Sequence, residues 1–352
     1  MERAYKRWVL GLLAGIFLLL TVCGVAVYRV DPCFYYRMSP EREGVFFDER
    51  YQSAGIIRNV PADTVLVGTS MAANYRATAI SETFNSPSVR ITIPDGYLSE
   101  FNQVMQAVFR EQTPERVVFV LDPNIMVRDE KGVTDAMPEY LYNDSVLDDI
   151  NYLLNKDTLY YCLYTMMTNT WGGTQTLDEG FTWDKETWWN HVAALNNYKR
   201  PELATEPLSA NAYEKRTADN LAVVESWISA HPETEFIILF PPYSILFWDK
   251  IGRLGQTDAM LSALEQAGTT LLPYNNVSLY GFLMDREIVE NLDNYCDYVH
   301  HSGEVSQMIL GKLKAGEHQL TMENLTETLA NWQEFVVNYP YEQFWEEAFW
   351  EQ

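Results

Sequence analysis

The amino-acid sequence has 352 residues, 47% of them hydrophobic and 21% charged, and its formal net charge is −24. This length is enough to bury a large core, either as one domain or as one domain with a sizeable insertion. No basic stripe accompanies the acidic excess, so nucleic acid is excluded as an expected partner. We interpret the charge mainly as a solubility feature, and it also disfavours tight docking on anionic lipid or polymer away from an active cleft.

The first predicted element is an uncharged apolar run from Trp8 to Tyr28, long enough to span a bilayer as a helix. Three basic residues precede it, namely Arg3, Lys6 and Arg7. The positive-inside rule then predicts a single-pass protein of the cell membrane with its N-terminus in the cytoplasm, residues 1–30 as the anchor and the rest outside. A cleaved signal peptide ending near Gly24 to Ala26 is the alternative, although the run exceeds the usual length of a signal sequence.

After a juxtamembrane segment at 31–60, strand and helix patterns alternate along the chain. Strands are predicted at residues 64–67, 89–93, 116–121, 235–240 and 270–272, and helices at 70–80, 99–111, 146–167, 211–230, 259–266 and 304–313. Strands separated by helices predict an α/β fold with a mostly parallel sheet covered on both faces.

This alternation defines the expected domain organisation. We predict a domain at 61–320, interrupted by a long aromatic stretch at 128–205, and an acidic, aromatic C-terminal tail at 321–352. A loop of that length inside a compact domain is usually functional, as a lid or a substrate wall. A satellite subdomain that only packs is the alternative. The tail is expected to be either a docked helix or an extension.

Two short stretches carry the predicted chemistry. Ser70 follows the first strand in a tight Gly-Thr-Ser turn, and Asp297 stands three residues before His300. A serine hydroxyl needs a base to remove its proton, and a carboxylate can fix the tautomer of that base, so these residues predict a nucleophile, a base and an orienting acid. In the alternatives, Ser70 is a helix N-cap, Asp297 caps the following helix, or His301 is the base at a less usual spacing.

Further polar groups follow the second and third predicted strands. The carboxyl ends of parallel strands meet at one edge of a sheet, so Ser70, Gly96 and Asn124 are expected to converge there. The amide of Gly96 and the side chain of Asn124 are candidate oxyanion donors, while Asn74, one turn after Ser70, faces either the pocket or solvent. Gly96 as a positive-φ turn residue and Asn124 as a turn residue after Pro123 are the alternatives.

Neither a metal nor a cofactor is predicted. The other histidines, His191, His231 and His318, lack carboxylate or cysteine partners at ligand spacing, and no glycine-rich phosphate loop is present. The four cysteines show no CxxC spacing, and a disulfide between Cys162 and Cys296 stays open.

The order of these features resembles that of the SGNH (GDSL-like) hydrolase superfamily. Ser70, Gly96, Asn124 and the Asp297/His300 pair stand in the family's order over roughly residues 61–316, although Gly-Thr-Ser replaces Gly-Asp-Ser and the Gly-x-Asn-Asp block is absent. The resemblance implies a flavodoxin-like three-layer α/β/α sandwich with a catalytic serine. A single anchor before such a domain is similar to envelope proteins that move or remove acyl groups, such as the D-alanyl-transfer protein of teichoic acid modification.

From this resemblance we expect a membrane-anchored, extracytoplasmic serine esterase or O-acyltransferase that acts on acyl esters of a cell-envelope glycan or polymer. Hydrolysis and transfer share an acyl-enzyme, so the sequence leaves them open. A multi-pass membrane acyltransferase is one candidate partner. The alternatives are a non-catalytic SGNH-like scaffold that binds such a polymer or partner, and an assembly protein that recruits a partner through its acidic tail.

Overall fold

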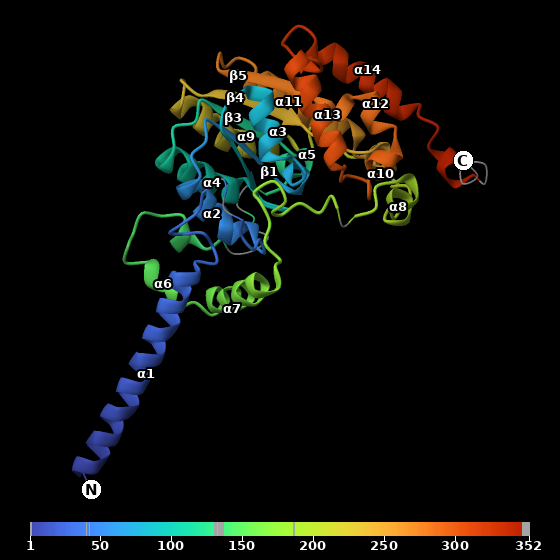
Figure 1. Cartoon of the computed structure of the whole chain (residues 1–352). Coiled ribbons are helices and arrows are strands. Elements are labelled where there is room, and N and C mark those ends of the chain that lie inside the picture. Colours follow the sequence, from blue (N-terminus) through green and yellow to red (C-terminus); the bar gives the residue numbers. More distant parts are fainter. Residues whose placement is uncertain are drawn as a thin grey trace. The chain divides into compact units, whose positions relative to one another are not determined.

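A six-stranded sheet forms the centre of the α/β fold in the computed structural model, which describes residues 2–39, 41, 43–129, 132, 137–185 and 187–346 (Figure 1). The strands are β1 (Thr64–Gly68), β2 (Ser88–Thr92), β3 (Arg116–Val120), β4 (Glu235–Phe240), β5 (Val277–Gly281) and β6 (Gln319–Leu320). Their order is β2-β1-β3-β4-β5-β6, with the first five parallel and β6 antiparallel to β5. This is the flavodoxin-like order with one antiparallel edge strand added, and it confirms the predicted fold class.

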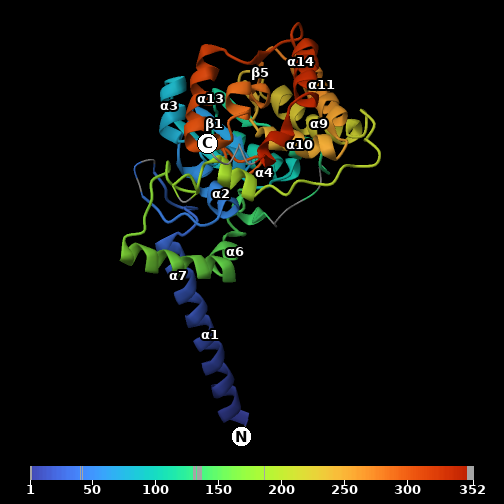
Figure 2. The ribbon, with the colours of Figure 1, turned by 90° about the vertical axis from the view of Figure 1, so that its right-hand side faces the viewer.

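Helices cover both faces of the sheet. On one face α3 packs against α13, and on the other α11 packs against α9 and α14, as Figure 2 shows. These helices are α3 (Ala77–Phe84), α9 (Glu214–Ala230), α11 (Thr257–Leu271), α13 (Gly303–Ala315) and α14 (Leu325–Val337). The buried strands read as nearly continuous apolar runs, as expected when neither face meets water.

Most of the remaining elements are short, and the exceptions are α1, α2, α4 and α7. The other helices are α1 (Glu2–Val30), α2 (Glu49–Asn59), α4 (Leu98–Glu111), α5 (Pro123–Met126), α6 (Asp149–Leu153), α7 (Lys156–Trp171), α8 (His191–Asn196), α10 (Ile245–Arg253) and α12 (Arg286–Val289). The 3-10 helices are η1 (Ser70–Ala72), η2 (Glu139–Leu141), η3 (Phe282–Met284), η4 (Leu292–Asn294) and η5 (Tyr341–Trp345). Among the described residues, one helix is long and apolar enough to cross a membrane, and that helix is α1.

Three predicted elements are wrong in detail. The helix expected at 70–80 is the short turn η1, and α3 begins only at Ala77. The strand expected at 270–272 belongs to the end of α11, since so short a segment cannot be distinguished from a helix end by its pattern. The helix expected at 146–167 is broken into α6 and α7, because the side chain of Asn155 caps α7 by accepting from the N–H of Asp157 at 2.7 Å.

The chain divides into two compact units. Unit 1 comprises residues 1–61, 106–112 and 136–181, and unit 2 comprises residues 62–105, 113–135 and 182–352. The domain boundaries inferred from the sequence stay predictions. Parts of the predicted insertion (130, 131, 133–136 and 186) and of the predicted tail (347–352) lie outside the described residues.

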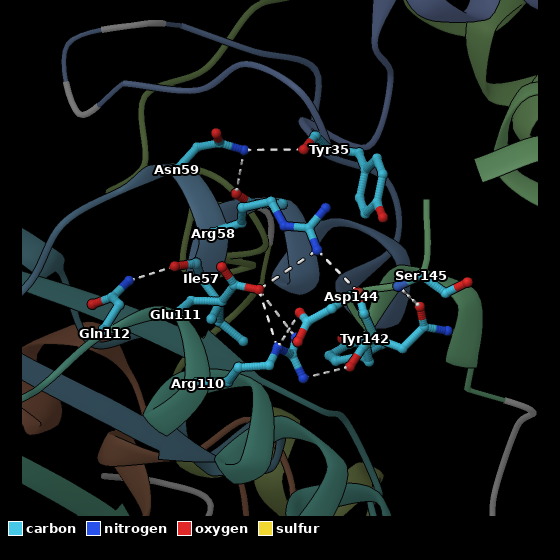
Figure 3. Close-up of polar contacts among 12 residues, drawn as sticks. Tyr35, Ile57, Arg58, Asn59, Arg110, Glu111, Gln112, Tyr142, Asp144 and Ser145 are labelled. Carbon is cyan, nitrogen blue, oxygen red and sulfur yellow. Dashed lines mark hydrogen bonds and ion pairs between the residues drawn. The ribbon is translucent and has the colours of Figure 1, made fainter. Parts of the chain in front are cut away.

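Unit 1 contains a cluster of ion pairs around Glu111, drawn in Figure 3. The Oε1 atom of Glu111 lies 3.5 Å from Arg58 Nη2 and 3.1 Å from Arg110 Nη2. Arg110 also pairs with Asp144 through Nε at 2.6 Å and donates through Nη1 to the carbonyl of Tyr142 at 2.9 Å. The cluster therefore joins α2 to the last turn of α4 and to the segment after η2.

Candidate active site

Ser70 lies at the carboxyl end of β1 in a turn that is fixed by its neighbours. A Cβ added to Gly68 would come within 2.8 Å of both Ala72 and Val120, so only glycine allows η1 to pack this closely beside β3. Thr69 caps η1 by accepting from the N–H of Met71 at 3.3 Å. The alternative in which Ser70 is the N-cap is therefore wrong, and its hydroxyl is left to contact another group.

That group is His300. Ser70 Oγ lies 2.9 Å from His300 Nε2, and His300 Nδ1 lies 2.7 Å from Asp297 Oδ2. All three residues belong to unit 2, although Ser70 stands 230 positions before His300. With a proton on Nδ1 that is donated to Asp297, Nε2 is free to accept the Ser70 proton. The structure thus brings the three predicted residues together in the geometry of a nucleophile, a base and an orienting acid.

Asp297 fixes the conformation of the Asp-x-x-His segment through hydrogen bonds. Its Oδ1 atom accepts the backbone N–H groups of Val299 and His300, both at 2.8 Å, while Oδ2 faces the imidazole. Burial alone would raise the pKa of Asp297, but hydrogen bonds from the ring and backbone of His300 and from the backbone of Val299 lower it overall, so the group is an anion at neutral pH. Asp297 does not cap α13, because Ser302 occupies that position.

The second histidine, His301, has a different environment. Its ring is buried, its Nδ1–H donates to the carbonyl of Ser302 at 3.1 Å, and it stands edge-on to the ring of Tyr75. Burial lowers the pKa of His301 to about 4, so it is neutral at physiological pH. The hydrogen bond to Ser70 is made by His300, so His301 is not the base of this arrangement.

Asn74 is neither in a pocket nor in solvent. It is buried, its Nδ2 donates to the carbonyl of His301 at 3.1 Å, and its Oδ1 accepts from Thr182 Oγ1 at 2.9 Å. Asn74 therefore connects the segment that follows Ser70 to the segment that carries His300. Its role in this geometry is to position those segments.

Gly96 and Asn124, the expected oxyanion donors, have other partners. The N–H of Gly96 donates to the carbonyl of Ile93 at 3.0 Å, and Asp95, with φ of 52°, takes the positive-φ position expected of Gly96. Asn124 Nδ2 donates to Tyr243 Oη at 3.0 Å. An oxyanion role for Gly96 requires its single N–H to leave Ile93, whereas Asn124 keeps a second amide proton besides the one donated to Tyr243; both roles stay predictions. Within the described part of the chain, the N–H of Ser70, at the start of η1, has no hydrogen-bond acceptor.

Asp122 is a junction between strand ends. Its carboxylate accepts from Thr69 Oγ1 at 3.1 Å, from the N–H of Asn124 at 2.8 Å and from the hydroxyl of Tyr243. These partners follow β1, β3 and β4, so one buried acid connects three turns at the same edge of the sheet. The sequence reading missed Tyr243, although it stands after β4 and the strand-end rule that selected Ser70 would have found it.

An aromatic segment contacts the histidine from a part of the chain that sequence motifs do not mark. The ring of Trp183 stands edge-on to His300 with centroids 4.7 Å apart, and lies 5.5 Å from the ring of Trp189. Asp184 Oδ1 accepts the N–H of Gly303 at the start of α13, at 2.7 Å. Together with the Thr182 contact to Asn74, these contacts hold residues 182–184 and Trp189 beside His300.

Other candidate chemistry is limited. Searching the residues that the structure describes finds no group of three or more His, Cys, Asp or Glu side chains placed to hold a metal ion. All four cysteines are free thiols, so the disulfide left open by the sequence is not formed.

Comparison with known proteins leaves the family open. No protein-family model matches this chain, and no curated protein matches it. The findings assign an α/β domain with a mostly parallel sheet and an N-terminal apolar helix, and the activity has to be argued from the site itself.

Proposed function

We propose that this chain is a membrane-anchored, extracytoplasmic serine esterase or O-acyltransferase that acts on acyl esters of a cell-envelope glycan or polymer. The observation that carries the proposal is the chain of contacts from Ser70 Oγ to His300 at 2.9 Å and from His300 to Asp297 at 2.7 Å. It is supported by the order of Ser70, Gly96, Asn124 and the Asp-x-x-His motif, which resembles that of SGNH hydrolases.

The reaction would run through an acyl-enzyme. Ser70 Oγ attacks the ester carbonyl while His300 Nε2 takes the hydroxyl proton, and the resulting imidazolium is stabilised by the Asp297 carboxylate. Collapse of the tetrahedral intermediate breaks the bond to the leaving alcohol, which receives the proton from His300. Water or an acceptor hydroxyl then attacks the acyl-enzyme, with His300 again taking and returning one proton.

The location follows from α1 and the charges before it. Three basic residues at the start of the chain favour an N-terminus in the cytoplasm, and in this proposal unit 2 then lies on the extracytoplasmic side. Envelope polymers with ester-linked acyl groups are the substrates available there.

Aromatic rings favour a sugar-bearing substrate. Trp188 is 79% exposed, five positions after Trp183, whose ring contacts His300. Flat, exposed aromatic faces near a catalytic base suit the apolar faces of pyranose rings, and Trp and Tyr combine large contact area with a polar handle. A glycan hydroxyl bound there would compete with water for the acyl-enzyme and make transfer the outcome.

A fluorophosphonate probe tests the proposal, because it forms a stable adduct only with an activated serine. We expect the wild-type chain to be labelled and Ser70→Ala to lose the label. Ser226→Ala, at an exposed serine on α9, is the matched control and should keep it. Release of acid from an acetylated glycan, with and without a second glycan as acceptor, then separates hydrolysis from transfer.

The non-catalytic scaffold is the second candidate. One observation favours it: the groups expected to form an oxyanion hole, Gly96 and Asn124, are bonded to Ile93 and Tyr243. A wild-type chain that folds normally, binds the polymer and reacts with no probe would support the scaffold and remove the enzyme.

A further inference from the structure

Helix α7 carries a stripe of large apolar side chains on an exposed face. Tyr160, Leu163, Tyr164, Met167 and Trp171 follow one another at positions i, i+3, i+4, i+7 and i+11, a spacing that places them on one side of a helix. All five are exposed, from 43% for Tyr164 to 76% for Trp171.

The opposite face of α7 is the buried one. Thr158, Cys162 and Thr165 are buried, and Tyr161 stacks on Phe47 with ring centroids 4.0 Å apart. A helix of a water-soluble domain normally turns its large apolar residues inward and its small polar residues outward. Since α7 does the reverse, its exposed face is suited to an apolar environment outside unit 1.

Both α6 and α7 pack against α1, and α7 lies crosswise to α1 in both views (Figures 1 and 2). A Cβ added to Gly24 would lie 3.7 Å from Leu154 and 3.8 Å from Leu153, the residues at the end of α6. Gly24 belongs to the apolar run of α1 and lies about 9 Å before the end of that helix at Val30, at 1.5 Å per residue. The α6 and α7 helices therefore flank the last turns of the segment that would lie in the membrane.

The apolar surface is continuous from α1 to α6. An open groove between these two helices is lined by apolar side chains, among them Phe17, Leu20, Val25, Ile150, Leu153 and Leu154. Val146 and Leu147, just before α6, are about four-fifths exposed (78% and 83%). This surface extends the lipid-facing face of α1 sideways to α6, next to α7.

We infer that α6 and α7 lie in the headgroup and outer acyl zone of the leaflet from which α1 emerges, with the α7 stripe turned toward lipid. The inference rests on the proposed anchoring by α1. Tyr160, Tyr164 and Trp171 are the residue types that occupy the boundary between hydrocarbon and water, and a helix crosswise to a spanning helix runs along the membrane surface. The inferred occupant is lipid, and the contact would hold unit 1 at a fixed depth.

The contact is apolar and not electrostatic. Residues 158–177 contain no Asp, Glu, Lys or Arg, and the whole chain has a net charge of −24. Attraction to anionic headgroups needs clustered basic residues near the surface. Binding of α7 should therefore be as strong in neutral phosphatidylcholine as in a membrane rich in anionic lipid.

Native methionines report on this contact in the full chain. Met166 and Met167 on α7 are 49% and 52% exposed, and Met322 in unit 2 is 57% exposed, so the three should oxidise at similar rates where no lipid covers them. With one purified chain per phosphatidylcholine nanodisc, we expect peroxide to oxidise Met167, which belongs to the stripe, several-fold more slowly than Met322, as read by mass spectrometry. Equal rates would overturn the inference.

A double variant on α7 and a control variant on α14 sharpen this test. Leu163→Asp combined with Trp171→Asp should bring oxidation of Met167 up to the rate of Met322 while the chain stays in the nanodisc through α1. Val337→Asp, at a similarly exposed position on α14 (66%), is the matched control and should leave Met167 protected. Exposed positions are chosen so that folding is preserved.

Other outcomes identify which proposal fails. If Met167 is protected from oxidation only after a multi-pass membrane protein is added, the stripe binds a protein partner and not lipid. If its protection needs anionic lipid, the contact is not purely apolar and this part of the inference is contradicted. A chain that does not enter nanodiscs would remove both the anchor and this inference. Labelling of Ser70 by the fluorophosphonate probe in the same samples reports the activity separately.

Discussion

The two sides of the candidate site are built in different ways. On one side, Asp297 and His300 are held by bonds within four consecutive residues. On the other side, Ser70 is held by Gly68, by the Asp122 junction and by Asn74, whose partners come from distant parts of the chain. The local side is set by its motif, whereas the serine side depends on the whole sheet being assembled.

The substitution with the strongest expected consequence is on the local side, at Asp297. Asp297→Asn keeps an oxygen for the N–H groups of Val299 and His300 but removes the charge that fixes the imidazole. The rate of probe labelling should fall by roughly 10³–10⁴-fold with little loss of stability. Asp293→Asn, in the same segment and paired with His191 at 2.7 Å, is the control and should label at the wild-type rate. A tenfold loss or less in Asp297→Asn would show that the carboxylate is dispensable.

A pH effect is expected from His301, which is buried beside the local side. The folded pKa is about 4 against an ordinary value of 6.5. Above pH 6.5 the ring is neutral in both states. Between about 6.5 and 4 the unfolded chain binds a proton that the folded chain does not, so the free energy of unfolding falls as the pH is lowered, by roughly 3 kcal/mol in total.

Urea unfolding at several pH values measures this loss. His301→Gln should remove most of it, so that the curves of variant and wild type converge as the pH falls toward 4. An unchanged slope in His301→Gln would contradict the assigned pKa.

A smaller effect is expected from the serine side. Asp122→Asn removes the charge that accepts from Thr69, Asn124 and Tyr243, and should lower the free energy of unfolding by about 2 kcal/mol. Because the Ser70 turn depends on this junction, labelling should slow as well. Urea unfolding and labelling rates together distinguish this variant from Asp297→Asn, where only the rate changes. Loss of rate without loss of stability would argue against the junction.

The smallest expected effect concerns Asn74. Asn74→Ala removes its bonds to His301 and Thr182, and should slow labelling more than Thr182→Val, which removes only one of them. We expect a loss of about 0.5 kcal/mol of stability for each of these bonds that is removed. Rates equal to wild type in both variants would show that Asn74 does not position the two segments.

Much of the fold could be predicted because the buried parallel strands are short apolar runs between helices. The first four strands and the helices at 99–111 and 304–313 follow that pattern directly. The strand at 270–272 was wrong because three residues are too few to show a period. The helix at 70–80 was wrong because the backbone is extended at Arg76, after η1, and α3 begins only after it.

The site was predictable where chemistry follows local spacing. Ser70, Asp297 and His300 could be named from a strand end and a three-residue interval. The partner of Asn124 could not, since it depends on how the turns after β3 and β4 meet. The N–H of Gly96 is taken locally by the carbonyl of Ile93, in a turn where Asp95 has the positive φ. Trp183 stands in the aromatic stretch that was expected to be functional, but its contact with His300 could not be predicted, because only the folded chain brings the two rings together.

The most direct measurement is peptide mapping of the fluorophosphonate adduct by mass spectrometry. We expect a single adduct on Ser70, formed at a rate that falls steeply in His300→Ala. An adduct on another residue, or labelling of Ser70 that is as fast without His300, would contradict the claim that this histidine makes the serine reactive.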